Sequence, residues 1–260
     1  MADDCPAAFV DFAGRLADAS GVVIKRHFRT RIEVERKTDE TPVTIADRES
    51  ETAMRRLINE TWPDHGIIGE EQGSEREDAA LVWVLDPIDG TRTFIAGKPM
   101  FGTLIALVRD GIPILGVIDQ PVLGERWVGG GRRTTFNGAA IGVRPCGALD
   151  EAVLNTTSPD LFAGDDAASF QRLSGAVAHT QYGGDCYAYG LLASGFMDLV
   201  VEAGLKPHDF CALVPVVEGA GGTITDWQGG ALSLSSDGRV IAAADPELHA
   251  HALERLNGAA

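Results

Sequence analysis

Several features that mark other classes of protein are missing from this sequence. Four cysteines occur in its 260 residues, widely spaced and with no C-x-x-C pair (Cys5, Cys146, Cys186 and Cys211). The sequence therefore predicts neither a zinc site nor a disulfide framework. It has no apolar run of membrane-spanning length, and its first residues are acidic and unlike the apolar region of a secretion signal. We expect a protein of the reducing cytoplasm.

Basic residues are also scarce. The chain has 22 lysines and arginines against 38 aspartates and glutamates, which gives a formal net charge of -16. Such a surface repels nucleic acid and anionic membranes, so we expect neither as a partner. It would also repel a phosphate ester unless metal ions reverse the local field. At 260 residues the chain is long enough for one large domain or two small ones, and its hydrophobic content of 45% is ordinary for a globular protein.

Hydrophobic spacing predicts a layered α/β protein. Apolar residues recur at helical intervals over 7–28 and again after Thr44, and short apolar strands follow from residue 66 onward. Further helices are predicted over 186–193, 210–220 and 246–256. Residues 143–151 are predicted to connect the two halves of the chain, and they do not have the composition of a flexible linker. We therefore expect two packed α/β subdomains, 1–145 with most of the candidate metal ligands and 146–260 completing the site.

The most informative stretch runs from Val82 to Phe94. A β-rich apolar strand ends at Asp86, and Pro87 is expected to end the strand ladder because proline lacks a backbone donor. Asp86 and Asp89 then flank the carbonyl of Ile88, so the turn presents only oxygen ligands, which suit Mg²⁺. The alternative interpretation is an ordinary strand, turn and helix cap.

Gly90 and Thr91 follow this turn and are positioned to begin a helix. The free N–H groups of a helix start attract anions. A cation site and an anion site within a few residues indicate metal-assisted chemistry on a phosphate.

Other carboxylates stand at the ends of predicted elements. Glu70 and Glu202 each follow an apolar strand, and Asp209 precedes an apolar helix. Asp47 lies in a Thr-x-x-Asp pattern typical of a capping box, and Asp185 precedes the helix over 186–193. For Asp47, Asp185 and Asp209 a plain helix-capping role is the alternative.

Four motifs together, in order and separation, resemble the inositol monophosphatase superfamily of Mg²⁺-dependent phosphatases over nearly the whole chain. They are Gly69-Glu70-Glu71, Asp86-Pro87-Ile88-Asp89-Gly90-Thr91, Asp209 at a helix start, and Gly219-Ala220-Gly221-Gly222 after that helix. The resemblance implies a five-layered αβαβα sandwich, usually a homodimer. One departure is Phe210, where many relatives have valine.

The resemblance also implies residue roles. Two or three Mg²⁺ ions would be bound by Glu70, Asp86, the Ile88 carbonyl, Asp89 and Asp209. Gly90 and Thr91 would bind phosphate through backbone N–H groups, and Thr91 and Asp47, with Glu70, would activate the attacking water. Lys37 and the loop after it would form a mobile lid, and Glu202 would contact substrate.

Within the superfamily the sequence is most similar to the histidinol-phosphatase branch, through the stretches 89–105, 183–189 and 202–207. Histidinol phosphate carries cationic groups, which Asp185 and Glu202 would pair with, while Arg92 would brace a nearby carboxylate. The alternatives are an inositol-1-monophosphatase or a broad sugar or nucleotide phosphatase, a non-catalytic Mg²⁺-binding protein, and an interaction module with an acidic face.

Overall fold

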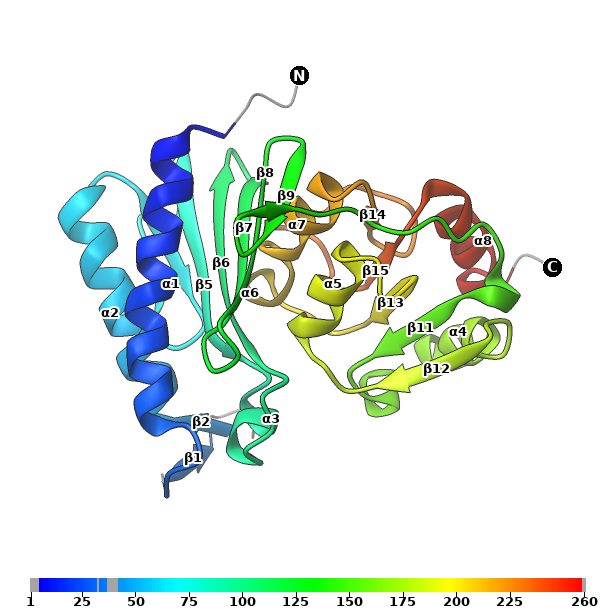
Figure 1. Cartoon of the computed structure of the whole chain (residues 1–260), viewed down its shortest axis with the longest axis horizontal. Coiled ribbons are helices and arrows are strands. Elements are labelled where there is room, and N and C mark those ends of the chain that lie inside the picture. Colours follow the sequence, from blue (N-terminus) through cyan, green and yellow to red (C-terminus); the bar gives the residue numbers. More distant parts are fainter. Residues whose placement is uncertain (1–4, 32, 37–41, 259–260) are drawn as a thin grey trace.

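The computed structural model describes residues 5–31, 33–36 and 42–258, and these form alternating layers of helices and sheets (Figure 1). The helices are α1 (Ala7–His27), α2 (Ile45–Thr61), α3 (Thr91–Ile95), α4 (Asp165–Ser174), α5 (Cys186–Ala193), α6 (Pro207–Phe210), α7 (Leu213–Gly219) and α8 (Pro246–Leu256), with 3₁₀ turns η1 (Leu149–Glu151) and η2 (Pro159–Leu161).

The strands fall into three sheets. They are β1 (Val34–Arg36), β2 (Pro42–Thr44), β3 (Gly66–Gly69), β4 (Gly73–Glu75), β5 (Leu81–Asp89), β6 (Gly102–Arg109), β7 (Ile112–Gln120), β8 (Glu125–Gly130), β9 (Arg133–Phe136), β10 (Ala139–Ala140), β11 (Val153–Thr156), β12 (His179–Tyr182), β13 (Leu199–Glu202), β14 (Thr223–Thr225) and β15 (Val240–Ala243). The large sheet has the order β10-β9-β8-β7-β6-β5-β3-β4 and the small one β12-β11-β13-β15-β14, while β1 and β2 pair separately.

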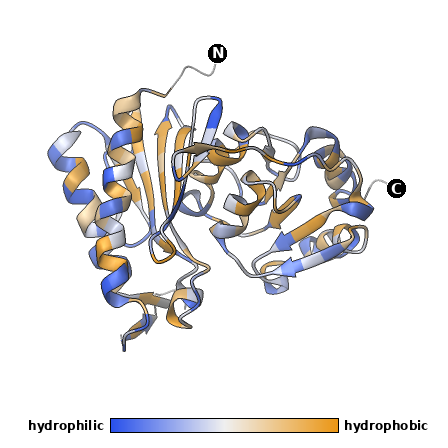
Figure 2. Ribbon diagram, in the orientation of Figure 1, coloured by the Kyte–Doolittle hydropathy of each residue, from blue (hydrophilic) through white to orange (hydrophobic). Residues whose placement is uncertain are grey.

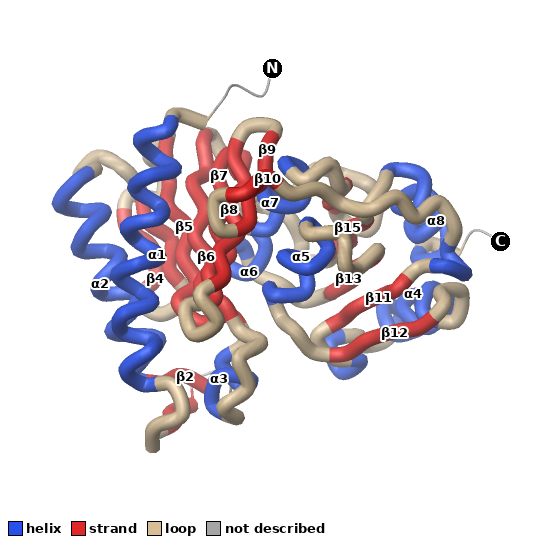
Figure 3. The backbone as a smooth tube through the Cα atoms, in the orientation of Figure 1, coloured by secondary structure: helices blue, strands red, loops and turns tan. Residues whose placement is uncertain are grey.

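Five layers follow one another across the molecule, as predicted: α1 and α2, the large sheet, α5 to α7, the small sheet, and α4 with α8 (Figure 3). Three hydrophobic cores fill the interfaces between the layers, and the central core extends to both sides of the α5–α7 layer. Phe12 and Met54 pack on Trp83 in the first, Trp127 and Tyr189 lie in the central one, and further apolar side chains fill the last. Figure 2 shows the same pattern, with hydrophobic residues along both sheets and polar ones outside.

The sequence places the strand end wrongly at Pro87. Strand β5 continues to Asp89, and its pairing with β6 resumes there opposite Gly102 after a register shift. The shift is where the proline fits, because a residue without a backbone donor is tolerated in a bulge. The Thr103 hydroxyl donates to the Pro87 carbonyl at 2.8 Å, which holds the bulge against β6.

The predicted helix over 210–220 is also wrong in its bounds. It is split into α6 and α7, and Asp209 lies inside α6, not before a continuous helix. Pro215 explains the break, because its ring excludes a helical bond to the carbonyl of Cys211, four residues earlier. Asp209 accepts a bond from the Lys206 backbone N–H at 2.7 Å and so caps the short helix.

Three further expectations concern the whole chain. The four cysteines are unpaired, as predicted. In the ranges that the structure describes, no helix is long and apolar enough to cross a membrane. The chain passes from the large sheet to the small one between β10 and β11, and the division at residue 145 stays a prediction because α7 also packs against β7 and β8.

Candidate active site

Three carboxylates converge between the two sheets. Asp86 and Asp89 come from the end of β5 and Asp209 from α6, and one oxygen of each lies within 4.8 Å of the others. Asp86 is buried and the other two are half-buried. Residues 120 positions apart in sequence are thus brought to one point by the packing of α6 against β5 and β6.

The proline bulge orients Asp86. Because Pro87 has no N–H, the next donor along the chain is that of Ile88, and it donates to Asp86 Oδ1 at 3.0 Å. The Ile88 carbonyl in turn accepts from the Thr91 hydroxyl at 3.1 Å. The sequence Asp-Pro-Ile therefore fixes its own carboxylate through a local turn. The role of the Ile88 carbonyl as a metal ligand stays a prediction.

Asp89 lies at the N-terminus of α5, where its Oδ2 accepts from the backbone N–H of Cys186 at 2.6 Å. The interpretation of Asp185 as the cap of this helix is wrong, because its side chain makes no capping bond. The residue has φ 44° and ψ -138°, unlike the extended conformation of an ordinary cap. Its carboxylate instead accepts from the Thr93 hydroxyl at 3.0 Å.

Burial, followed by mutual repulsion, makes the carboxylates of this cluster difficult to ionise. Burial raises the pKa of Asp86 well above its usual value, and the charges of Glu70, Asp89 and Asp209 raise it further. Burial and the charge of Asp185 raise the pKa of Asp89 in the same way, and burial raises that of Asp209. Buried oxygen ligands held this close fit a hard divalent cation such as Mg²⁺, whose charge would offset the repulsion.

Glu70 and Asp47 border the cluster. The carboxyl of Glu70 shares a hydrogen bond with Asp86, and its backbone N–H donates to the Leu85 carbonyl at 3.1 Å. Asp47 completes a capping box, since its Oδ2 accepts from the N–H and hydroxyl of Thr44 at 2.8 and 2.6 Å. The capping interpretation is therefore confirmed, and the catalytic role of Asp47 stays a prediction.

Only one oxygen of Asp47 takes part in the cap. Its other oxygen, Oδ1, is buried and has no hydrogen-bond partner among the described residues. Burial raises the pKa of Asp47 to about 6, against the lowering effect of the Thr44 bonds and with a further rise from the charge of Glu70. An unpaired buried acceptor is costly, so this oxygen is suited to receive a proton or hydrogen bond from a group bound in the site.

Gly90 is the N-cap residue of α3, which begins at Thr91 as predicted, and it has φ 87°. A Cβ at this position would lie 2.8 Å from Asp185 Oδ2, so a side chain is excluded by the close approach as well as by the backbone conformation. The first N–H groups of α3, beginning with Thr91, have no partner within the helix, which agrees with a phosphate-binding role for Gly90 and Thr91. That role stays a prediction.

A cavity of about 210 Å³ adjoins the cluster and is lined by Asp89, Asp185, Glu202 and Asp209, among others. Glu202 accepts from the Thr157 N–H at 3.2 Å and from the Tyr189 hydroxyl at 3.0 Å. Burial raises its pKa to about 7, although both bonds lower it.

Burial also raises the pKa of Asp185, which the Thr93 bond and the nearby charge of Arg92 partly oppose. Arg92 itself is exposed. Its charge acts on Asp185, and its role of bracing a carboxylate stays a prediction.

Of the predicted metal ligands, Asp86, Asp89 and Asp209 thus meet at one point and Glu70 borders them. Lys37 and residues 38–41, the predicted lid, lie outside the described residues. The sequence interpretation assigned no role to Thr93, Thr157 or Tyr189, which donate hydrogen bonds to the carboxylates of Asp185 and Glu202. Tyr189 did carry a signal, because a tyrosine inside an otherwise apolar helix needs a partner for its hydroxyl.

Known proteins are similar to this chain in sequence and in fold. A profile of the inositol monophosphatase family matches residues 7–259. The chain is 53% identical over 258 residues to a bifunctional phosphatase IMPL2, chloroplastic, of Arabidopsis thaliana (95% of this chain and 75% of that protein). It is 34% identical to a histidinol-phosphatase of Chlorobaculum parvum (90% and 91%). An inositol monophosphatase structure from Zymomonas mobilis is 50% identical, with TM-score 0.89 over 96% of this chain and 98% of that one.

Proposed function

This chain belongs to the inositol monophosphatase family of metal-dependent phosphatases, and we propose that it hydrolyses L-histidinol phosphate to L-histidinol and phosphate with Mg²⁺ as its cofactor. The ions would be bound by the carboxylates of Glu70, Asp86, Asp89 and Asp209. The substrate would occupy the adjoining cavity.

The observation that supports this substrate is the position of Glu202. It is 4% exposed and accepts bonds only from neutral groups, the Thr157 N–H and the Tyr189 hydroxyl, in the part of the chain that the structure describes. Asp185, a second carboxyl whose pKa is raised by burial, lines the same cavity. A substrate that brings an ammonium or imidazolium group would stabilise both anions, whereas a polyol offers only hydroxyls.

Each group of residues has its own role in the proposed hydrolysis. Backbone N–H groups at Gly90 and Thr91 bind the phosphate oxygens. The Thr91 hydroxyl and Asp47 orient the attacking water, and Asp47 Oδ1 accepts its proton. Asp185 and Glu202 hold the leaving alcohol. Bound Mg²⁺ supplies the positive charge that neutralises the phosphate and acidifies water.

Inositol-1-phosphate, or a wider range of sugar and nucleotide phosphates, is the second candidate. The 50% identity to the Zymomonas mobilis inositol monophosphatase supports it. Glu202 would then accept a substrate hydroxyl instead of pairing with a cation. Only the substrate differs between the two proposals, because both use the same metal and phosphate groups.

Phosphate release from L-histidinol phosphate and myo-inositol 1-phosphate, each with Mg²⁺ and with EDTA, tests the proposal. We expect a strong preference for histidinol phosphate that EDTA abolishes. Asp185→Ala should impair turnover of histidinol phosphate much more than that of inositol phosphate, while Asp165→Ala, an exposed acid on α4, should leave both unchanged. Equal losses on both substrates would reject the specificity role.

We also propose that the protein is a cytoplasmic homodimer that engages neither nucleic acid nor membranes. Sedimentation equilibrium tests the assembly, and a monomer at micromolar concentration would refute it. Fractionation of cells that express the full chain tests its location, and recovery with the membrane fraction would contradict the proposal.

A further inference from the structure

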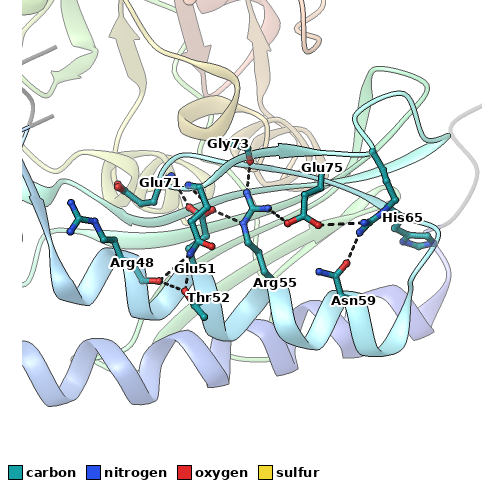
Figure 4. Close-up of polar contacts among 11 residues, drawn as sticks. Arg48, Glu51, Thr52, Arg55, Asn59, His65, Glu71, Gly73 and Glu75 are labelled. Carbon is teal, nitrogen blue, oxygen red and sulfur yellow. Dashed lines mark hydrogen bonds and ion pairs between the residues drawn. The ribbon is translucent and has the colours of Figure 1, made fainter. Parts of the chain in front are cut away.

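A buried ion pair lies directly behind the turn that presents Glu70. Glu51 and Arg55, one helical turn apart on α2, are 0% and 5% exposed, and Arg55 Nε lies 2.7 Å from Glu51 Oε1. Figure 4 shows both side chains pointing from α2 toward the β3–β4 connection. Burial of a charged pair is costly unless further hydrogen bonds satisfy its atoms, so the remaining contacts of this pair show what it is built to hold.

Among the described residues, the remaining hydrogen bonds of this pair go to the turn after Glu70 and to β4. Glu51 Oε2 accepts from the Glu71 backbone N–H at 2.7 Å, and Oε1 accepts from that of Gln72 at 3.1 Å. The carboxylate thus binds two successive N–H groups, as an anion does in a backbone concavity. Since the Glu70 N–H is bound on the other side by the Leu85 carbonyl of β5, three consecutive residues of the turn are fixed.

Arg55 secures the far side of the same turn. It donates to the Gly73 carbonyl and to Glu75 Oε1, the latter at 2.8 Å. Close fit is visible at Gly69, where an added Cβ would lie 2.1 Å from Glu51 Oε1 and 2.7 Å from Arg55 Nη2. The ion pair therefore fills the space behind the turn and binds its backbone from β3 to β4.

We infer that Glu51 is a positioning residue for the metal site, which sets cation affinity by fixing the backbone that aims Glu70 at Asp86. The inference goes beyond the proposed function, because it concerns binding of the cation and holds for any phosphate ester. Glu51 touches no reacting group and acts only through the turn. Groups that orient metal ligands typically contribute ten- to a hundredfold to affinity.

The test measures Mn²⁺ binding to the folded, metal-free protein by electron paramagnetic resonance. Mn²⁺ accepts the same oxygen ligands as Mg²⁺, and the assay needs no substrate. Glu51→Gln should weaken binding about tenfold, because an amide cannot accept from both N–H groups and Arg55 at once. Glu60→Gln, the same change at an exposed site on α2, should bind as the wild type does.

A second variant perturbs the contact without removing the carboxylate. Gly69→Ala should displace Glu51 from the turn and weaken Mn²⁺ binding in the same direction. A merely structural ion pair would lower the melting temperature of both variants and leave the Mn²⁺ dissociation constant of the folded fraction unchanged. Dissociation constants within twofold of the wild type in either folded variant would overturn the inference.

Discussion

Replacing Glu202 by glutamine should change how the stability of the metal-free protein depends on pH. The carboxyl of Glu202 is buried beside the Tyr189 hydroxyl and the Thr157 N–H, and folding raises its pKa from 4.5 to about 7. A carboxyl whose pKa is raised on folding stabilises the protein below pH 4.5, and that contribution is lost as the pH rises through 7. Glutamine does not titrate, so Glu202→Gln should lack this loss.

The size of the effect follows from the pKa change. At about 1.4 kcal/mol per pKa unit, raising the pH from 5 to 8 removes about 2.5 kcal/mol of stability through Glu202 alone. Other carboxyls with a raised pKa, such as Asp47 with a pKa of about 6, lower the stability of both proteins equally as the pH rises, so their contributions cancel in the comparison. Glu202→Gln should therefore be close to the wild type at pH 5 and more stable than it at pH 8.

Urea denaturation in EDTA at pH 5, 6, 7 and 8 measures this difference. The free energies of unfolding of the two proteins should separate mainly between pH 5 and 7, the interval between the unfolded and folded pKa values of Glu202, with equal dependence on urea concentration at each pH. Parallel pH profiles, within about 0.5 kcal/mol, would mean that Glu202 ionises normally. The reasoning from burial would then be refuted, together with its use as support for a cationic substrate.

Three other outcomes are expected. Mg²⁺ at about a hundred times its dissociation constant should raise the melting temperature of the wild type by roughly 5 to 10 °C in scanning fluorimetry. Asp86→Asn should abolish this rise, yet it should melt at a higher temperature than the wild type without metal, because one repelling charge is gone. An unchanged melting temperature of the wild type on adding Mg²⁺ would contradict the metal site. Gly116→Ala should lower the free energy of unfolding in urea by about 2 to 4 kcal/mol, since its Cβ would clash with a backbone carbonyl ahead of α7. Gly14→Ala in α1 should raise the free energy of unfolding by up to about 1 kcal/mol. Equal effects of the two substitutions would refute the explanation from packing. Tyr189→Phe should cost about 1 to 2 kcal/mol at pH 8 and less at pH 5, because its hydroxyl donates to the ionised Glu202, and a cost independent of pH would argue against that bond.

Local pattern was enough for most elements of the fold. Helix α1, the capping box of α2, the hairpin between β6 and β7 and helix α8 follow from spacing and turn residues that act within a few positions. The resemblance to the inositol monophosphatase superfamily supplied the five-layered arrangement. Two errors fell where distant contacts intervene: Pro87 is retained in β5 by its pairing partner β6, and Asp185 bonds to Thr93 instead of capping α5. The third, the split of the predicted helix over 210–220, has a local cause in Pro215.

For the site, the sequence by itself determined which groups carry the chemistry. Asp86, Pro87 and Ile88 form a turn that orients its own carboxylate, and the oxygen-only ligand set indicates a hard cation from residue type alone. The helical spacing also carried a signal that was not used. Glu51 lies on the same face of α2 as Met54 and Ile58, so the sequence already indicated that its carboxylate is buried.

Only the tertiary structure decided how strongly these groups interact. A carboxylate has an ordinary pKa in an unfolded chain, and it becomes difficult to ionise only when folding removes water and brings other charges within a few ångströms. Packing of α6 against β5 joins Asp209 to Asp86 and Asp89, and burial beside Tyr189 raises the pKa of Glu202 to about 7. Such distances depend on contacts between residues far apart in the sequence, so no local pattern contains them.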